Sequence, residues 1–219
     1  MLTKKVQGAG GAGGGGIELT YIASRSNVST SNIVVLPNGT QVGDLVISFA
    51  GTIGRQYNPA GWQEIFFYDG TFEINCRFKV MSSTDIAVGQ VQLASVTHDW
   101  SALQLHTFRP SSAITSTYVG VPTANRSYNG TAITVNPALS IKEPPHIIIG
   151  GNLYYNANYP DMSGTFWDGK ISSTGTNGLI RVQFAYEIQE DYETSRTFTQ
   201  TGTGNSAYDL MGGCYLSIE

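Results

Sequence analysis

One apolar strand pattern occurs twice in this chain, about 100 residues apart. In its first copy, residues 43–51, Leu45, Ile47 and Phe49 alternate with smaller residues and glycine ends the run. Alternation with a period of two predicts a strand, and the large apolar face predicts a central one. The second copy, residues 145–153, is again an apolar run closed by glycine.

The segments that follow the two copies also correspond. Each copy leads into a loop with Tyr, Asn and Pro and then into a Trp-containing turn, at residues 59–62 and 166–169. A long alternating strand and an aromatic-led closing strand come next in both halves. A repeat of this length predicts two facing sheets, because the repeat of a solenoid would be far shorter.

About twelve runs have the alternation of strands, and no window keeps a helical period. The predicted strands are residues 17–22, 33–36, 43–51, 62–68, 72–80, 91–96, 100–108, 131–135, 147–153, 179–188, 196–199 and 210–218. This pattern predicts an all-β fold, an antiparallel jelly-roll-like β-sandwich formed by one domain, residues 17–219. The polar segment from Pro110 to Asn129 is the predicted connection between the halves.

The predicted strand 72–80 has two chemically different faces. Its apolar residues share one face, and the other carries Glu73, Asn75, Arg77 and Lys79. We expect that second face to be in contact with solvent, as on the outer side of a two-layer sandwich.

Residues 1–16 form a glycine-rich stretch before the first predicted strand. Residues 8–13 match the dinucleotide-binding spacing G-x-G-x-x-G, but no strand precedes them and no helix pattern follows. Glycine loses the most entropy on ordering and has no side chain to offset the cost. We therefore interpret the stretch as an arm that becomes ordered only against a neighbouring subunit. Its glycines are Gly8, Gly10, Gly11, Gly13, Gly14, Gly15 and Gly16.

The composition argues against several classes of partner. The formal net charge is −4, and only 13% of residues are charged, so there is no basic surface for a nucleic acid. No apolar run is long enough to insert in a membrane, and no export signal precedes the domain. The expected surface is one of hydroxyl and amide groups.

The two cysteines, Cys76 and Cys214, lie in the middle of strand patterns. A disulfide is one interpretation, but the sequence favours two buried free thiols because nothing else indicates an oxidising compartment. Neither cysteine has a second ligand at metal-binding spacing, so we predict no metal site and no cofactor.

No pattern in the chain indicates a catalytic residue. His98 and Asp99 are neighbours, so on a strand they would point to opposite faces. Asp168 and Glu193 are the carboxylates that a polysaccharide depolymerase would use, although their spacing does not indicate a facing pair. A calcium ion at Asp161 or Asp168 lacks the spacing of a calcium loop. We predict that the protein is not an enzyme.

Two polar loops are the candidate ligand or partner sites. Tyrosine presents a flat apolar face, and asparagine adds amide donors and acceptors, which suit a sugar or a protein surface. The alternative is that most of these tyrosines cover the core. The candidate residues are Tyr57, Asn58, Tyr154, Tyr155, Asn156, Asn158 and Tyr159.

Three short motifs resemble a β-sandwich module that is widespread in tailed bacteriophages and prophages. They are Gly43-Asp44-Leu45-Val46, Pro59-Ala60-Gly61-Trp62 and Phe78-Lys79-Val80, followed by an aromatic-led closing strand. The resemblance spans about residues 17–219. It implies a non-enzymatic part of a virion, of the kind found on tail fibres and other exposed structural proteins.

From this resemblance we expect a virion protein that is made in the host cytoplasm and assembled through residues 1–16. The expected partners are capsid or tail subunits and further copies of the chain. Capsid decoration is favoured slightly over a tail-fibre position because the chain contains no shaft sequence. The alternative is an adhesin that binds a host-surface glycan for attachment.

Overall fold

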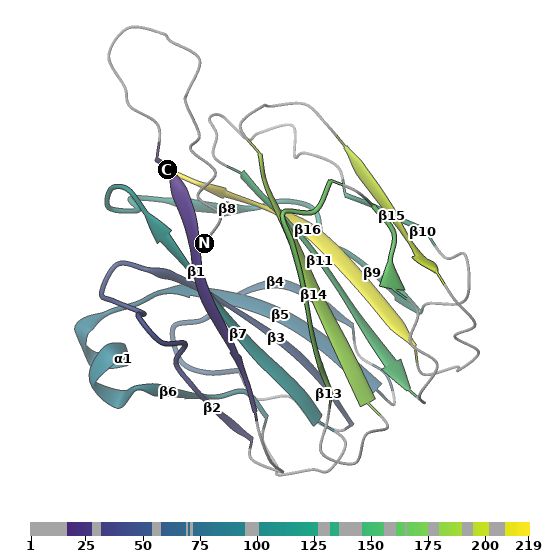
Figure 1. Cartoon of the computed structure of the whole chain (residues 1–219), viewed down its shortest axis with the longest axis horizontal. Helices are drawn as coiled ribbons and strands as arrows, with labels where there is room; N and C mark the ends of the chain where they lie inside the picture. The colour runs from purple at the N-terminus through teal and green to yellow at the C-terminus, as the bar shows by residue number, and fades with distance from the viewer. Residues whose placement is uncertain are drawn as a thin grey trace, which may run out of the picture.

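The computed structural model shows an almost entirely β-structured molecule with one short helix (Figure 1). It describes residues 17–27, 32–53, 58–68, 70, 72–94, 101–126, 132–135, 146–155, 161–164, 166–174, 180–189, 195–201 and 209–219. The predicted arm, residues 1–16, lies outside the described residues. The same is true of four candidate residues, namely Tyr57, Asn156, Asn158 and Tyr159.

Each half of the chain builds its own antiparallel sheet. The N-terminal sheet has the order β1 (Leu19–Ser26), β7 (Ser101–Pro110), β3 (Leu45–Ile53), β5 (Phe72–Val80), β4 (Gln63–Tyr68). The C-terminal sheet has the order β13 (Gly169–Thr174), β14 (Ile180–Gln189), β11 (His146–Tyr155), β16 (Leu210–Ile218), β8 (Thr117–Val119), and β9 (Thr123–Arg126) also pairs with β16. The predicted antiparallel β-sandwich is confirmed.

The two sheets have the same topology. In each, a central strand (β3 or β11) lies between the second strand of a consecutive pair (β4–β5 or β13–β14) and a return strand (β7 or β16). The first strand of each half, β1 or β8, pairs with the far side of that return strand. The repeat seen in the sequence is therefore a repeat of the whole sheet.

The connectivity differs from the predicted jelly roll. In a jelly roll the chain passes repeatedly between the two sheets. Here the described strands of each sheet come from one half, and the chain crosses between β7 and β8, over residues 111–116. That crossing lies within the predicted connection from Pro110 to Asn129, which also contributes β8 and β9.

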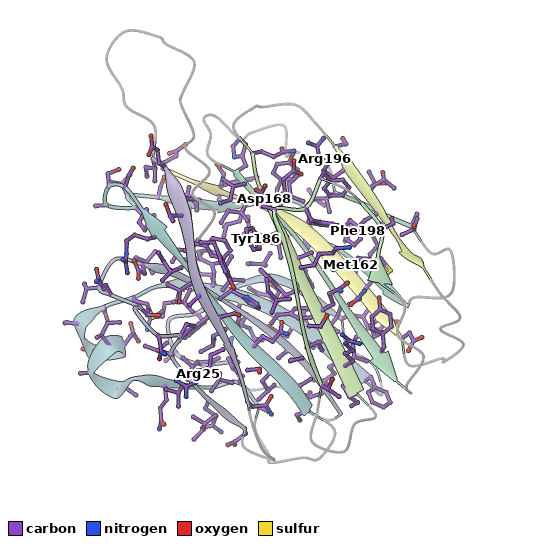
Figure 2. The ribbon with its side chains drawn as sticks, viewed as in Figure 1. Arg25, Met162, Asp168, Tyr186, Arg196 and Phe198 are labelled. Atoms are coloured by element: carbon purple, nitrogen blue, oxygen red, sulfur yellow. The ribbon has the colours of Figure 1, made fainter. Side chains whose placement is uncertain are left out.

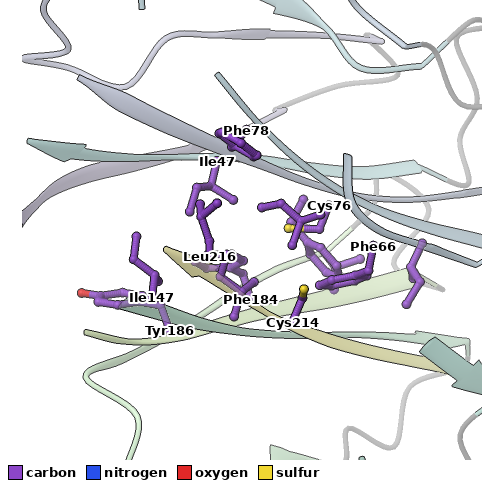
Figure 3. Close-up of a cluster of buried hydrophobic side chains, with 14 of the residues drawn as sticks. Ile47, Phe66, Cys76, Phe78, Ile147, Phe184, Tyr186, Cys214 and Leu216 are labelled. Carbon is purple, nitrogen blue, oxygen red and sulfur yellow. The ribbon is translucent and has the colours of Figure 1, made fainter. Parts of the chain in front are cut away.

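The two central strands interlock across the core. A Cβ on Gly151 would lie 2.4 Å from Cε2 of Phe49, and a Cβ on Gly51 would lie 2.4 Å from Cδ1 of Leu153. Each central strand thus provides the glycine over which the other places a large side chain. Figure 3 shows the surrounding core, where Ile47 and Phe78 face Ile147, Phe184 and Leu216.

An outer layer covers part of each sheet (Figure 1). Strands β2 (Ile33–Val35) and β6 (Gln90–Gln92), with helix α1 (Ser83–Val88), lie against the N-terminal sheet. Strands β10 (Ala132–Val135), β15 (Arg196–Thr201) and β12 (Asp161–Met162) lie against the C-terminal sheet, where Phe198 and Met162 are fully buried. The β2–β6 and β10–β15 pairs occupy matching places in the two halves.

The prediction that the polar face of β5 is exposed to solvent is wrong. Glu73, Asn75 and Arg77 are buried, and only Lys79 of that face remains partly exposed. The outer side of the N-terminal sheet is partly covered by β2, β6 and α1. Alternation between apolar and polar residues therefore does not indicate which face of this strand is exposed.

The prediction of two buried free thiols is confirmed. Cys76 on β5 and Cys214 on β16 are both free and both have no exposed surface. They belong to the same core cluster on opposite sheets (Figure 3). Burial raises the pKa of the Cys214 thiol to about 12 and that of Cys76 well above its ordinary value, so both stay protonated at neutral pH.

Candidate functional site

The Gly43-Asp44 motif forms a structural joint where β3 begins. Gly43 has φ +88°, a conformation that favours glycine, and Asp44 is 2% exposed. The Asp44 carboxylate accepts hydrogen bonds from Nε and Nη2 of Arg109, each at 2.9 Å, and from the backbone N–H of Gln41 at 2.8 Å. The motif therefore ties the start of β3 to the end of β7.

The other two motifs of the phage-like pattern form a second joint. The backbone N–H of Trp62 donates to the carbonyl of Pro59 at 3.2 Å, and Gly61 takes φ +80° to complete the turn. Trp62 then packs in the outer core cluster. Lys79 passes close to Gly61 and donates to Asp85 of α1 at 2.7 Å. Both joints consist of contacts that hold neighbouring elements of the N-terminal half together.

The second half has its own Trp-containing joint. Nε1 of Trp167 donates to the carbonyl of Ser163 at 3.0 Å, and its ring packs edge-on against Phe198 with centroids 5.2 Å apart. Asp168, a candidate catalytic carboxylate, accepts a hydrogen bond from the backbone N–H of Ile188 at 2.8 Å. In Figure 2, Asp168 lies near Tyr186, whose backbone carbonyl accepts from the Asp168 N–H at 2.9 Å.

A polar network covers the outer face of the C-terminal sheet beside β15. His146 Nδ1 lies 3.0 Å from Ser217 Oγ, and the Tyr215 hydroxyl donates to Gln189. Arg196 donates from Nε and Nη2 to the Glu187 carboxylate, both at 2.8 Å, and these hydrogen bonds raise the pKa of Arg196. His146 has no exposed surface, so its contact with Ser217 connects buried strands and is closed to a substrate.

Both ends of the described chain lie at one end of the sandwich, which we call the terminal end (Figure 1). The backbone N–H of Glu18 donates to Ser111 Oγ at 2.8 Å, and the N–H of Thr115 donates to the Glu219 carbonyl at 2.6 Å. The start of β1, the crossing segment and the end of β16 are therefore held together. Residues 1–16 join the domain here, at the buried Ile17.

The opposite end, which we call the distal end, is where both central strands finish. Phe49 faces Gly151 and Gly51 faces Leu153, so β3 and β11 run in the same direction. They end at Ile53 and Tyr155. The two candidate polar segments, residues 54–58 and 156–160, follow directly from these strand ends in the sequence. Asn58, the described member of the first segment, is exposed.

The structure corrects the prediction for Tyr154. This residue belongs to β11 rather than to a loop, and it is only 2% exposed. Its hydroxyl contacts the side-chain amide of Asn152, which is also buried. Tyr154 therefore supports the strand, as the alternative interpretation of these tyrosines expects, and cannot contact a ligand at the surface. Tyr155 is the last residue of the same strand.

Four buried polar atoms toward the distal end have no hydrogen-bond partner among the described residues. They are Asn75 Nδ2, Ser101 Oγ, Asn152 Oδ1 and Ser173 Oγ, which come from both sheets, and His106 Nδ1 in the middle of β7 is a further such atom. In the N-terminal sheet, Glu73, Thr52 and Ser101 lie in one cross-strand row. Each unpartnered polar group costs on the order of 1–3 kcal/mol. These four unpartnered polar atoms therefore lie toward the end of the sandwich from which the candidate segments continue.

Sequence patterns did not reveal this buried polar set. Asn75, Ser101 and Asn152 lie within strands, where a polar residue between apolar ones normally indicates an exposed face. One signal was available: Asn152 directly follows two glycines in an otherwise apolar run, and Ser101 directly follows Trp100.

Comparison of the chain with protein-family models, curated proteins and solved structures gives no match. Within the described residues, no helix has the length and apolar character needed to cross a membrane. In that same part of the chain, no three His, Cys, Asp or Glu side chains are grouped to share a metal ion.

Proposed function

We propose that this protein is a non-enzymatic structural component of a tailed-phage virion, displayed on the particle and assembled through residues 1–16. The observation that carries the proposal is the opposition of the two ends. The glycine-rich segment joins at the terminal end, and both Tyr- and Asn-containing segments follow strands that finish at the distal end. This arrangement suits a module attached at one end and presented at the other.

The motifs that resemble the phage module support the proposal. Asp44 holds the start of β3 to Arg109 of β7, Trp62 closes a turn with Pro59, and Lys79 binds Asp85 of α1. The resemblance therefore lies in residues that make contacts within the fold. Backbone without side chains can approach a neighbouring subunit closely, which is the role we assign to Gly8–Gly16. Capsid decoration is favoured only slightly over a tail-fibre position, and several copies are expected on each particle.

Mass spectrometry and immunogold labelling of phage particles produced with this gene test the proposal. We expect the protein in purified particles at many copies, and its loss from them when residues 2–16 are deleted. A matched variant replaces residues 2–16 with an equally long Ser/Thr sequence, which separates an effect of arm length from an effect of bare backbone. Particles that never contain the intact protein would contradict the proposal.

A second candidate function is a host-attachment adhesin that binds a surface glycan. It is favoured by the position of the two Tyr- and Asn-containing segments, which follow strands that finish at the distal end, because sugars are recognised by amide and hydroxyl groups together with aromatic faces. Of its candidate residues, Asn58 is exposed, and Tyr57 and Tyr159 lie outside the described residues.

An array of bacterial capsular and O-antigen polysaccharides, probed with the purified domain, tests this second function. We expect binding that is lost in a Tyr57→Ala/Tyr159→Ala variant and kept in Tyr118→Ala, which removes a tyrosine that is 46% exposed on β8. Equal binding by the two variants, or no binding by the unmodified protein, would reject the adhesin.

A further inference from the structure

His106 lies in the core between the two sheets. It is on the inner face of β7, has no exposed surface, and stacks on Phe184 of β14 with ring centroids 3.9 Å apart and an interplanar angle of 16°. Nε2 of His106 is 3.1 Å from Oε1 of Gln104, and Nε2 of Gln104 donates to the carbonyl of Ile171 on β13 at 3.3 Å. The ring and its partner therefore connect the two halves of the chain.

The hydrogen bonds determine where the proton of the ring lies. The carbonyl of Ile171 can only accept, so the amide nitrogen of Gln104 points to it and the amide oxygen points to His106. That oxygen can also only accept, so Nε2 of His106 carries the hydrogen. Nδ1 is then a bare acceptor, and it has no hydrogen-bond partner among the residues that the structure describes. A second proton on the ring would sit on buried Nδ1 with nothing to accept its hydrogen bond.

No described carboxylate faces the ring. The groups around it from the neighbouring elements are Ser24 and Tyr21 of β1, Ile47 of β3, Phe184 and Tyr186 of β14, and Ile171 of β13. The two tyrosines are the titratable members of this set, and burial raises the pKa of both, so they remain neutral. The surroundings therefore offer nothing to stabilise a positive charge.

We propose that His106 makes the packing of the two sheets sensitive to acid: the sheets stay together while the ring is neutral and come apart when it takes up a proton. All ladder hydrogen bonds within a described sheet come from one half of the chain, and the exposed residues 111–113 lie in the segment that joins the halves. A charge placed between the sheets thus acts on their side-chain contacts, which hold the sandwich closed.

The direction and size of the effect follow from linkage. Burial lowers the pKa of His106 from 6.5 to about 3, so the unfolded chain binds a proton that the folded chain rejects. The contribution of His106 to stability is complete above pH 6.5 and is lost as the pH falls from 6.5 towards 3. At pH 4.5 the two pKa values shift the unfolding equilibrium by about 100-fold toward the open chain.

Urea unfolding of the wild-type protein and of His106→Leu, measured between pH 7.5 and 4.5, tests the proposal. We expect the ratio of their unfolding constants to change by about 100-fold over this range, with the wild type losing more. His146→Gln removes the other described buried histidine and serves as the control background. The ratio of the unfolding constants of His146→Gln and His106→Leu/His146→Gln should change with pH by the same factor as the ratio for wild type and His106→Leu. Equal losses in wild type and His106→Leu would overturn the proposal.

A second measurement does not depend on whether the leucine variant folds. In wild-type protein labelled with nitrogen-15 histidine, we expect the His106 ring signals of the folded state to remain those of the neutral form down to pH 4.5. A folded-state ring that titrates near pH 6.5 would overturn the proposal, because the sandwich would then accommodate the charge.

Discussion

Gly151 lies where the ring of Phe49 crosses the core, so it cannot gain even one carbon without movement. An added Cβ would be 2.4 Å from the ring, and Phe49 is fully buried. We predict that Gly151→Ala lowers the free energy of unfolding by about 1–3 kcal/mol, the usual cost of overpacking. Urea unfolding measures this loss.

A double-mutant cycle shows whether Phe49 causes that loss. Phe49→Leu shortens the side chain over Gly151, so we expect Gly151→Ala to cost clearly less in the Phe49→Leu background than in wild type. Additive losses in the double variant would mean that the strain arises elsewhere.

The Asp44–Arg109 pair should matter more than the other well-formed pair of this sheet. Asp44 is nearly fully buried, and its carboxylate also holds the Gln41 N–H, so we predict that Asp44→Asn costs about 1–3 kcal/mol of unfolding free energy. The Lys79–Asp85 pair is about one-fifth exposed on each side, and Lys79→Met should cost less than about 1 kcal/mol. Thermal unfolding compares the two, and equal losses would contradict the prediction.

Single residues could be predicted from the sequence where their chemistry admits one placement. Cys76 and Cys214 are apolar thiols within strands, and both are buried as expected. Arg77 was misplaced because polar atoms on a strand were assumed to face solvent, and Tyr154 because β11 was predicted to end at residue 153. A sheet with a covered outer face buries such a side chain with a partner instead, as the Arg77–Glu64 pair at 3.5 Å illustrates.

Helix α1 is the element that strand periodicity could not reveal. Its signal is local: Ser82 Oγ accepts from the Asp85 N–H at 3.2 Å, the Asp85 carboxylate accepts from the Ser82 N–H at 2.9 Å, and Gly89 ends the helix at φ +68°. The sequence from Ser82 to Gly89 contains this capping box, but the six residues of the helix are too few to show a helical period.

We predict that Ser82→Ala destabilises α1 by about 1 kcal/mol through loss of the cap. The helix itself has no fully buried residue, so the effect should be local. Amide hydrogen exchange should speed up across Asp85–Val88 and remain unchanged in β3 and β11. Ser83→Ala, one residue further on and outside the cap, is the control and should leave exchange in α1 close to wild type.

The long strands were all predicted, as were the short β2 and β10, whereas four other strands were missed. The central strands β3 and β11 carry enough alternating apolar residues to be recognised, although β11 runs two residues beyond its predicted end. Strands β8, β9, β12 and β13 are short, rich in Ser and Thr or both. Such strands exist because a neighbouring strand offers backbone hydrogen bonds, which local sequence does not record.

At the scale of the molecule, the two-fold plan was visible in the sequence and its connectivity was not. Corresponding strands appear in the same order in both halves, which indicated two sheets. Which strands pair depends on long-range contacts, so the jelly-roll expectation had no local test. The two candidate segments were recognised as corresponding because each follows one copy of the repeated strand in the sequence. The structure adds that both of these strands end at the distal end.

A circular permutant tests whether the order of the two halves along the chain matters for folding. Glu219 and Ile17 can be joined by a short Gly/Ser linker and the chain opened between Ser112 and Ala113, because all three sites lie at the terminal end. We predict one cooperative unfolding transition with stability within about 2 kcal/mol of residues 17–219. Failure to fold would show that the order of synthesis of the halves matters.

The reciprocal glycine contacts of β3 and β11 also leave a trace that evolution can reveal. Positions 49 and 151, like positions 51 and 153, form linked pairs in which one member must be small if the other is large. Among descendants of a common ancestor, alanine at position 151 should therefore accompany a reduced side chain at position 49. Covariation within each of these two pairs would identify homologous chains whose sequences have otherwise diverged.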